Sequence, residues 1–145
     1  MPRLDDISGT SHDVLEVPSL PWLTQAISPG FIKGGVYLLA GEPGIGKTTL
    51  ALQILGDFAS AGRRVLYLTT EQGLGDLKRS VERIHGDKSG RLPSTIRENF
   101  LIDDSLEDID NLPKFLARRI LTQGEDYHGV DVLVLDSGDC PVPRW

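Results

Sequence analysis

The strongest constraint on the fold is a glycine-rich stretch of eight residues, Gly-Glu-Pro-Gly-Ile-Gly-Lys-Thr at positions 41–48. It fits the pattern G-x-x-x-x-G-K-[ST], in which backbone N–H groups surround a phosphate. An apolar run at 36–40 precedes it and predicts a strand buried on both faces, and a helical stripe follows at 50–58. A helix beginning near Gly46 or Lys47 would add its positive dipole end to this loop. We therefore expect a phosphate-binding loop, with an unliganded glycine-rich turn as the alternative.

Strand and helix patterns alternate along the rest of the chain. The predicted strands lie at 65–70, 100–102 and 132–135, and the predicted helices at 77–84 and 112–121. Strands that alternate with helices build parallel sheets with helices on both faces. Together with the phosphate-binding loop, this pattern predicts an α/β fold, the three-layer sandwich of P-loop NTPases.

Two further segments have no clear apolar period. Residues 1–20 contain proline, serine and scattered acids, and we expect a loose lead-in there, followed by one domain at 21–145. Residues 87–98 are polar and basic and predict a loop. Basic side chains between positions 78 and 97 could face nucleic acid or a neighbouring subunit, although a solvated helix face is the favoured interpretation.

The loop residues and one distant acid form the predicted nucleotide site. Lys47 would bridge the β- and γ-phosphates, and the Thr48 hydroxyl would bind Mg²⁺. Asp136 ends a run of four aliphatic residues and fits the Walker B role, in which a strand delivers an acid to Mg²⁺ through a water molecule. The predicted nucleotide contacts are Gly41, Glu42, Pro43, Gly44, Ile45, Gly46, Lys47, Thr48 and Thr49.

Hydrolysis also needs a group that orients or deprotonates the attacking water. Glu71 follows the predicted strand at 65–70 and would lie at the same sheet edge as Lys47 and Asp136. From the residues alone, a catalytic base and a surface acid in a turn remain equally open.

Composition limits the partners and the compartment. Twenty-one acidic and fifteen basic residues give a net charge of −6, so no global basic field attracts nucleic acid or anionic membrane. No apolar stretch approaches the ~18 residues of a membrane span, and residues 1–20 do not resemble a signal peptide. The single cysteine, Cys140, excludes a disulfide framework and a CxxC zinc site within this chain. We expect a cytoplasmic protein that does not associate with membranes.

The segments at 41–49, 65–72 and 132–137 together resemble the RecA-like ATPases, most closely the RadA (Sms) and KaiC branch. In that branch a glycine-rich loop precedes the first strand, as residues 28–35 do here. The resemblance implies that Glu71 is the catalytic base and that the cofactors are ATP and Mg²⁺. It also implies a homo-oligomer, a hexamer in this family, and a role in DNA repair or recombination.

The chain also departs from that family. It has no four-cysteine zinc finger, so the resemblance is to a RadA-like core. In RecA-like sheets the strand after Walker B inserts between the Walker A and Walker B strands, and the DNA-contacting loops follow it. This chain stops nine residues after Asp136. We therefore expect a truncated product or fragment that lacks this strand and those loops and is marginally stable alone.

The leading functional hypothesis is an ATP-binding and ATP-hydrolysing module. The sequence has no N-K-x-D motif, which disfavours GTP. Two alternatives share the same loop: a P-loop kinase that phosphorylates a small molecule, and a non-catalytic remnant that binds nucleotide without turnover.

Overall fold

The computed structural model describes residues 3–6, 14–42, 45–69, 73–104 and 129–136. The chain divides into two compact units, 1–38 and 39–145, which are described separately here. The predicted division into a lead-in at 1–20 and a domain at 21–145 stays a prediction. None of the helices in the described ranges is long and apolar enough to cross a membrane.

The first unit is built around a small antiparallel pair. Its elements are η1 (Leu4–Asp6), β1 (Val14–Leu15), α1 (Pro21–Ala26) and β2 (Phe31–Ile32). Val14 lies opposite Ile32 in the register of β1 and β2. Gly30 has φ +147°, and a Cβ there would lie 2.7 Å from Val14 Cγ1, so only glycine fits between these strands. This pair was not predicted, because two-residue strands are too short to show a period.

The second unit contains a three-stranded parallel sheet in the order β4-β3-β5. The strands are β4 (Phe100–Asp103), β3 (Val65–Thr69) and β5 (Val132–Asp136). All five residues of the central strand are buried. Val65 lies opposite Phe100 on one side and Val132 on the other, and Thr69 lies opposite Asp136. The sheet confirms the predicted α/β fold with a parallel sheet.

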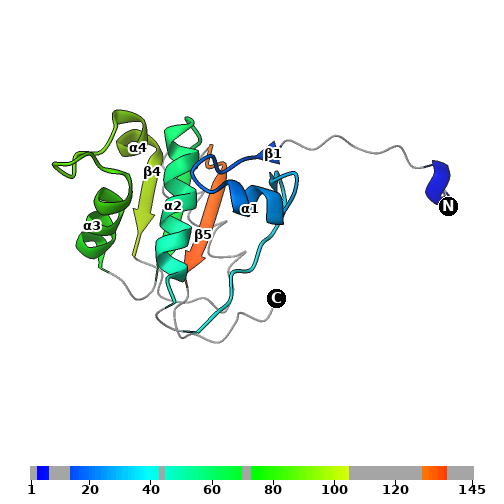
Figure 1. Ribbon diagram of the computed structural model, residues 1–145, viewed down its shortest axis with the longest axis horizontal. Helices are drawn as coiled ribbons and strands as arrows, with labels where there is room; N and C mark the ends of the chain where they lie inside the picture. The colour runs from blue at the N-terminus through cyan, green and yellow to red at the C-terminus, as the bar shows by residue number, and fades with distance from the viewer. Residues whose placement is uncertain (1–2, 7–13, 43–44, 70–72, 105–128, 137–145) are drawn as a thin grey trace. The chain divides into compact units, whose positions relative to one another are not determined.

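Helix α2 (Lys47–Ser60) covers one face of this sheet (Figure 1). Leu52, Leu55 and Phe58 are buried along it. Helices α3 (Leu74–His85) and α4 (Ser94–Asn99) pack against α2 on the β4 side. On the other face of the sheet, Leu66 and Leu68 pack against neighbouring aliphatic side chains.

Two predicted features of this unit can be compared with the structure. The helix at 77–84 is confirmed, and Gly86 ends it as expected. The prediction of a loop across 87–98 is wrong over its second half, where α4 forms after Pro93. Ile96 is the one buried residue of this helix, and a single apolar residue does not produce a helical period in the sequence. The helix predicted at 112–121 lies outside the described residues.

The predicted strand at 36–40 is wrong. These residues adopt no strand, and their large side chains are exposed: 88% for Val36, 79% for Leu38 and 50% for Leu39. A strand forms only against the edge of another strand. Strand β5 pairs on one side with β3, and no strand in the described ranges pairs with its other side. The run at 36–40 has a strand-like composition, but it forms no ladder with this open edge or with any other strand in the described ranges.

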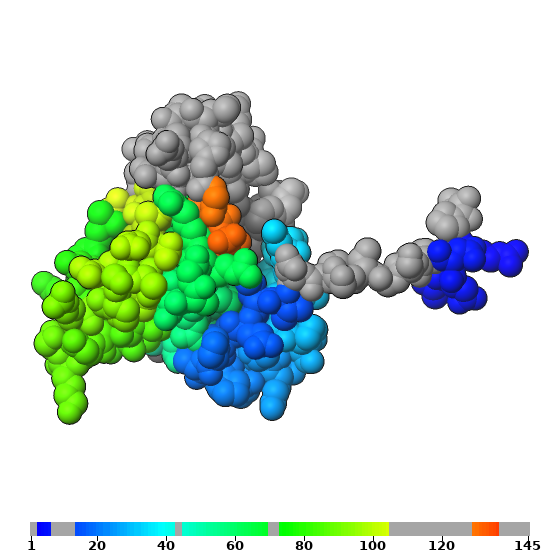
Figure 2. All heavy atoms as spheres, turned by 90° about the horizontal axis from the view of Figure 1, so that it is seen from above, coloured from blue at the N-terminus to red at the C-terminus, as the bar shows by residue number. Residues whose placement is uncertain are grey.

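In the space-filling view of Figure 2, α2 and β5 lie side by side, seen from the end opposite to the one where α2 begins and β5 ends. Their contact is the structural basis of the candidate site, because α2 begins and β5 ends at the same edge of the sheet.

Candidate functional site

Two residues 88 positions apart in the sequence meet at the carboxyl edge of the sheet. Thr48 is the second residue of α2, and Asp136 is the last residue of β5. The Thr48 hydroxyl donates a hydrogen bond of 3.1 Å to Asp136 Oδ2. Both side chains are half-buried. The structure thus joins the start of the helix after the glycine-rich loop to the predicted Walker B acid.

Tyr67 is a third member of this cluster and was missed in the sequence analysis. Its hydroxyl donates to the same oxygen, Asp136 Oδ2, from the middle of the buried strand β3. Burial raises the pKa of Tyr67 well above its ordinary value, and the neighbouring Asp136 carboxylate raises it further. Tyr67 therefore remains a protonated donor at neutral pH. A signal existed: the hydroxyl of a tyrosine in the middle of a buried strand needs a hydrogen-bond partner.

The glycine-rich loop ends where α2 begins. Gly46 caps the helix with φ +95°, a left-handed conformation that glycine adopts without strain. Its carbonyl accepts the Leu50 N–H at 2.9 Å, the first hydrogen bond of the helix. The Lys47 ammonium donates to the Gly41 carbonyl, so this cation lies against the backbone at the opposite end of the loop.

The other predicted site residues have varied positions. Glu42 and Ile45 in the loop and Thr49 in α2 are exposed. Pro43, Gly44 and Glu71 lie outside the described residues, so their predicted roles stay predictions. Thr69 ends β3 directly opposite Asp136.

The donor set at this edge fits a magnesium ion. Mg²⁺ prefers hard oxygen ligands and commonly takes one or two from protein and the rest from phosphate and water. Thr48 and Asp136 supply a hydroxyl and a carboxylate oxygen within hydrogen-bonding distance of each other. In the part of the chain that the structure describes, no group of three or more His, Cys, Asp or Glu could hold a metal alone. A metal at this edge would therefore take its remaining ligands from phosphate oxygens and water.

An AAA domain family matches residues 9–139, most of the chain. The chain belongs to this family. The match confirms the relation to RecA-like P-loop ATPases that the sequence predicted, near the RadA and RadB proteins.

Individual relatives cover the chain to different extents. The DNA repair and recombination protein RadB of Methanosphaera stadtmanae is 31% identical over 133 residues, 90% of this chain and 53% of its own length. The DNA repair protein RadA of Mycolicibacterium smegmatis is 41% identical over 61 residues, 42% of this chain and 13% of its own length. RadA of Chlamydia trachomatis is 36% identical over 85 residues, 57% of this chain and 18% of its own length. The chain thus spans between an eighth and about half of these relatives. No solved structure gave a significant match.

Proposed function

We propose that this chain binds ATP with Mg²⁺ in the loop at 41–49 and hydrolyses it. The observation that carries the proposal is the hydrogen bond between Thr48 and Asp136, because it brings together a hydroxyl and a carboxylate suited to one magnesium ion. The glycine-rich loop beside them offers backbone N–H groups and the N-terminal end of a helix of 14 residues to the phosphates.

Each residue of the site has a proposed task. The Lys47 ammonium would exchange the Gly41 carbonyl for the terminal phosphate oxygens, which are stronger acceptors because they carry charge. Thr48 and Asp136 would hold Mg²⁺, and Mg²⁺ when bound would neutralise charge that develops on the phosphates. Tyr67 would keep Asp136 Oδ2 in place by donating to it. Glu71 would orient and deprotonate the attacking water.

The biological setting is proposed from the relatives. Their names record DNA repair for RadA and DNA repair and recombination for RadB. We propose that this chain serves the same kind of process, in a homo-oligomer that is hexameric and contacts DNA.

A second candidate is nucleotide binding without turnover. The exposed run at 36–40 leads directly into the phosphate-binding loop, and it lies outside the ladder of the sheet. A phosphate-binding loop that is held by α2 but not by a paired strand could still bind phosphates. It would position them less rigidly for hydrolysis. This observation favours a nucleotide-binding module over the small-molecule kinase, which no feature of the described residues supports.

Single-turnover phosphate release from Mg-ATP distinguishes these functions. We expect the wild-type chain to release phosphate and Glu71→Gln to bind ATP but to release at least about a hundredfold more slowly. Lys47→Ala should weaken ATP binding itself, and Lys33→Ala is a matched control outside the loop. Binding by wild type without any release would contradict hydrolysis and support the binding module. Absence of binding would contradict both.

A further inference from the structure

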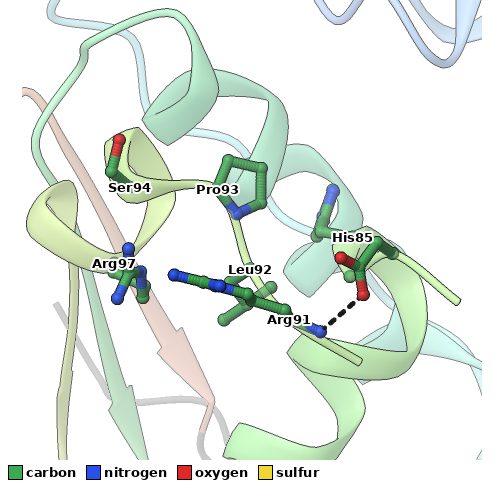
Figure 3. Close-up of a pocket in the computed structure, with 8 residues that line it drawn as sticks. His85, Arg91, Leu92, Pro93, Ser94 and Arg97 are labelled. Carbon is green, nitrogen blue, oxygen red and sulfur yellow. Dashed lines mark hydrogen bonds between the residues drawn. The ribbon is translucent and has the colours of Figure 1, made fainter. Parts of the chain in front are cut away.

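A hollow lies between the end of α3 and the start of α4 (Figure 3). Its volume is about 480 Å³, and it is open to solvent. Helix α4 ends directly before β4 begins, so the hollow lies toward the amino ends of the strands. Asp136 lies at the carboxyl end of the parallel strand β5. The hollow is therefore separate from the candidate nucleotide site.

The loop on one side of the hollow is held in a defined shape by Asp87. Its Oδ1 accepts the Ser89 N–H at 2.9 Å, the Ser89 hydroxyl at 2.6 Å and the Arg91 N–H at 3.0 Å. The Asp87 N–H in turn donates to the Arg91 carbonyl at 3.0 Å. These hydrogen bonds fix the backbone from which the Arg91 side chain extends.

Two guanidinium groups line the hollow without a carboxylate partner. The Arg91 side chain runs toward Arg97 of α4 (Figure 3). Both arginines are exposed, and neither forms an ion pair within the described ranges. Two cations that approach each other are stabilised by an anion between them. The pair offers forked hydrogen bonds to such an oxyanion.

Ser94 brings a hydroxyl to the same hollow (Figure 3). It is exposed, and its hydroxyl makes no hydrogen bond to any residue that the structure describes. Arg97 follows three residues later in α4, a spacing at which helical side chains are neighbours. Arg91 approaches Arg97 from the facing loop. An oxyanion attached to Ser94 would therefore lie within reach of both guanidinium groups.

We propose that Ser94 is a phosphorylation site and that Arg91 and Arg97 hold its phosphate. A phosphoserine adds a charge of about −1.5 to −2 and three strong acceptor oxygens. In the transfer, Ser94 Oγ attacks the γ-phosphorus of ATP bound to a serine/threonine protein kinase. The Oγ–P bond forms, the bond from phosphorus to the β,γ-bridging oxygen breaks, ADP leaves, and the hydroxyl proton passes to a carboxylate of the kinase. The two guanidinium groups, rather than the end of this six-residue helix, provide the attraction.

Two other serines near the hollow lack these features. The Ser89 hydroxyl already donates to Asp87, so a phosphate there would face an acid. Ser80 is half-buried within α3, and the cations before it, Lys78 and Arg79, already have acidic partners. Of these three serines, Ser94 alone combines an exposed hydroxyl with cations that lack a partner.

A kinase also needs access to the chain around the hydroxyl. Residues 91–93 form neither helix nor strand, and α4 buries one residue, Ile96. A helix this short is marginal by itself, so it can open locally for the kinase. Arg91 would then present positive charge to a kinase that selects basic substrates. This site does not depend on ATP binding by the loop at 41–49.

The first part of the test is phosphorylation of the full chain by a serine/threonine kinase that selects arginine near its target serine. Mass spectrometry of the peptides locates the phosphate. We expect Ser94 to be the main site, and Ser94→Ala to lose most of the incorporated phosphate. A folded wild-type chain without phosphate on Ser94 would overturn the proposal.

The second part installs phosphoserine at position 94 during translation and follows it by phosphorus NMR. We expect its second pKa to lie below the ordinary value of about 6, because two guanidinium groups favour the dianion. The modified chain should also melt about 4 °C above the unmodified one. In the variant Arg91→Ala/Arg97→Ala, both differences should disappear.

The matched control is Lys78→Ala/Arg79→Ala, which removes the same charge from α3, where both cations have acidic partners. It should keep the lowered phosphoserine pKa and the higher melting temperature. An ordinary pKa in the modified wild type, or equal changes in the two variants, would contradict a phosphate held by Arg91 and Arg97. Circular dichroism checks that each variant folds, and failure of ATP binding would leave these results unaffected.

Discussion

Strand β3 and the run at 36–40 are two apolar segments of equal length with opposite fates. Val65–Thr69 is buried along its whole length, with a paired strand on each side. In the run at 36–40 the exposed fraction reaches 88% at Val36, and no strand forms. Composition is similar in the two segments, so the difference comes from their neighbours. Apolar, β-branched sequence makes a strand favourable, but a strand forms only where it pairs with a neighbouring strand, as β3 does on both sides.

The same comparison explains why the sheet holds Asp136 of the candidate nucleotide site but not the segment that leads into its glycine-rich loop. Its acid side is fixed, because Asp136 ends a strand that pairs residue by residue with β3. The glycine-rich loop on the other side of the site follows the run at 36–40, which forms no strand. This loop is held where it joins α2, at Gly46. Strand β5 also leaves Leu133 37% exposed at the edge of the sheet. Among the described residues nothing pairs with the outer side of β5, and an open edge of this kind promotes association with other strands.

Replacing one leucine by alanine in each segment should give the largest difference in the free energy of unfolding. Leu68 is fully buried in β3, and Leu38 is 79% exposed. We expect Leu68→Ala to lower the free energy of unfolding by about 2–5 kcal/mol, because it leaves a cavity. Leu38→Ala should stay within about 0.5 kcal/mol of wild type. Urea unfolding followed by circular dichroism measures both. If the two variants lost similar amounts of unfolding free energy, the run at 36–40 would be packed in solution as firmly as β3.

The next contrast uses the one tyrosine in each segment. Removing the Tyr67 hydroxyl with Tyr67→Phe takes away a donor to Asp136. We expect the Mg²⁺ affinity of the ATP complex to fall about tenfold, because partners of metal ligands orient them. ATP binding without Mg²⁺ should be unchanged. Titration of Mg²⁺ into each variant with ATP, followed by calorimetry, measures this difference.

Tyr37→Phe is the matched control for that experiment. The Tyr37 hydroxyl accepts the Ile32 N–H at 2.8 Å, and its ring contacts Phe31 edge to face with 4.7 Å between centroids. None of these contacts involves the metal site, so Mg²⁺ affinity should match wild type. Equal losses in the two variants would show that Tyr67 acts through general packing rather than through Asp136.

The smallest expected effect comes from a charge placed in the exposed run. Val36→Lys should change the free energy of unfolding by less than about 0.5 kcal/mol, since its side chain already faces solvent. It should also reduce association at high protein concentration, because a lysine discourages pairing between strands. Light scattering against concentration tests this. A strongly destabilised Val36→Lys would contradict the exposed placement of this run.

The sequence predicted the local parts of this fold and missed the parts that depend on distant neighbours. Strand β5 and helix α3 follow from short-range apolar patterns, although α3 begins at Leu74, before the predicted start at 77. The run at 36–40 is exposed because it pairs with no strand in the described ranges, and pairing with distant strands is not recorded in a local pattern. Tyr67 shows the same limit within the site. Its strand was predicted correctly, but its contact with Asp136 joins residues 69 positions apart.

The central claim is that Thr48 and Asp136 together form a magnesium site for a nucleotide bound at 41–49. Calorimetric titration of ATP into the full chain, with and without Mg²⁺, tests it most directly when wild type is compared with Asp136→Asn. The account predicts that Mg²⁺ strengthens ATP binding by wild type and that Asp136→Asn loses this gain while still binding metal-free ATP. An equal gain from Mg²⁺ in both proteins, or no heat of binding from folded wild type, would contradict it.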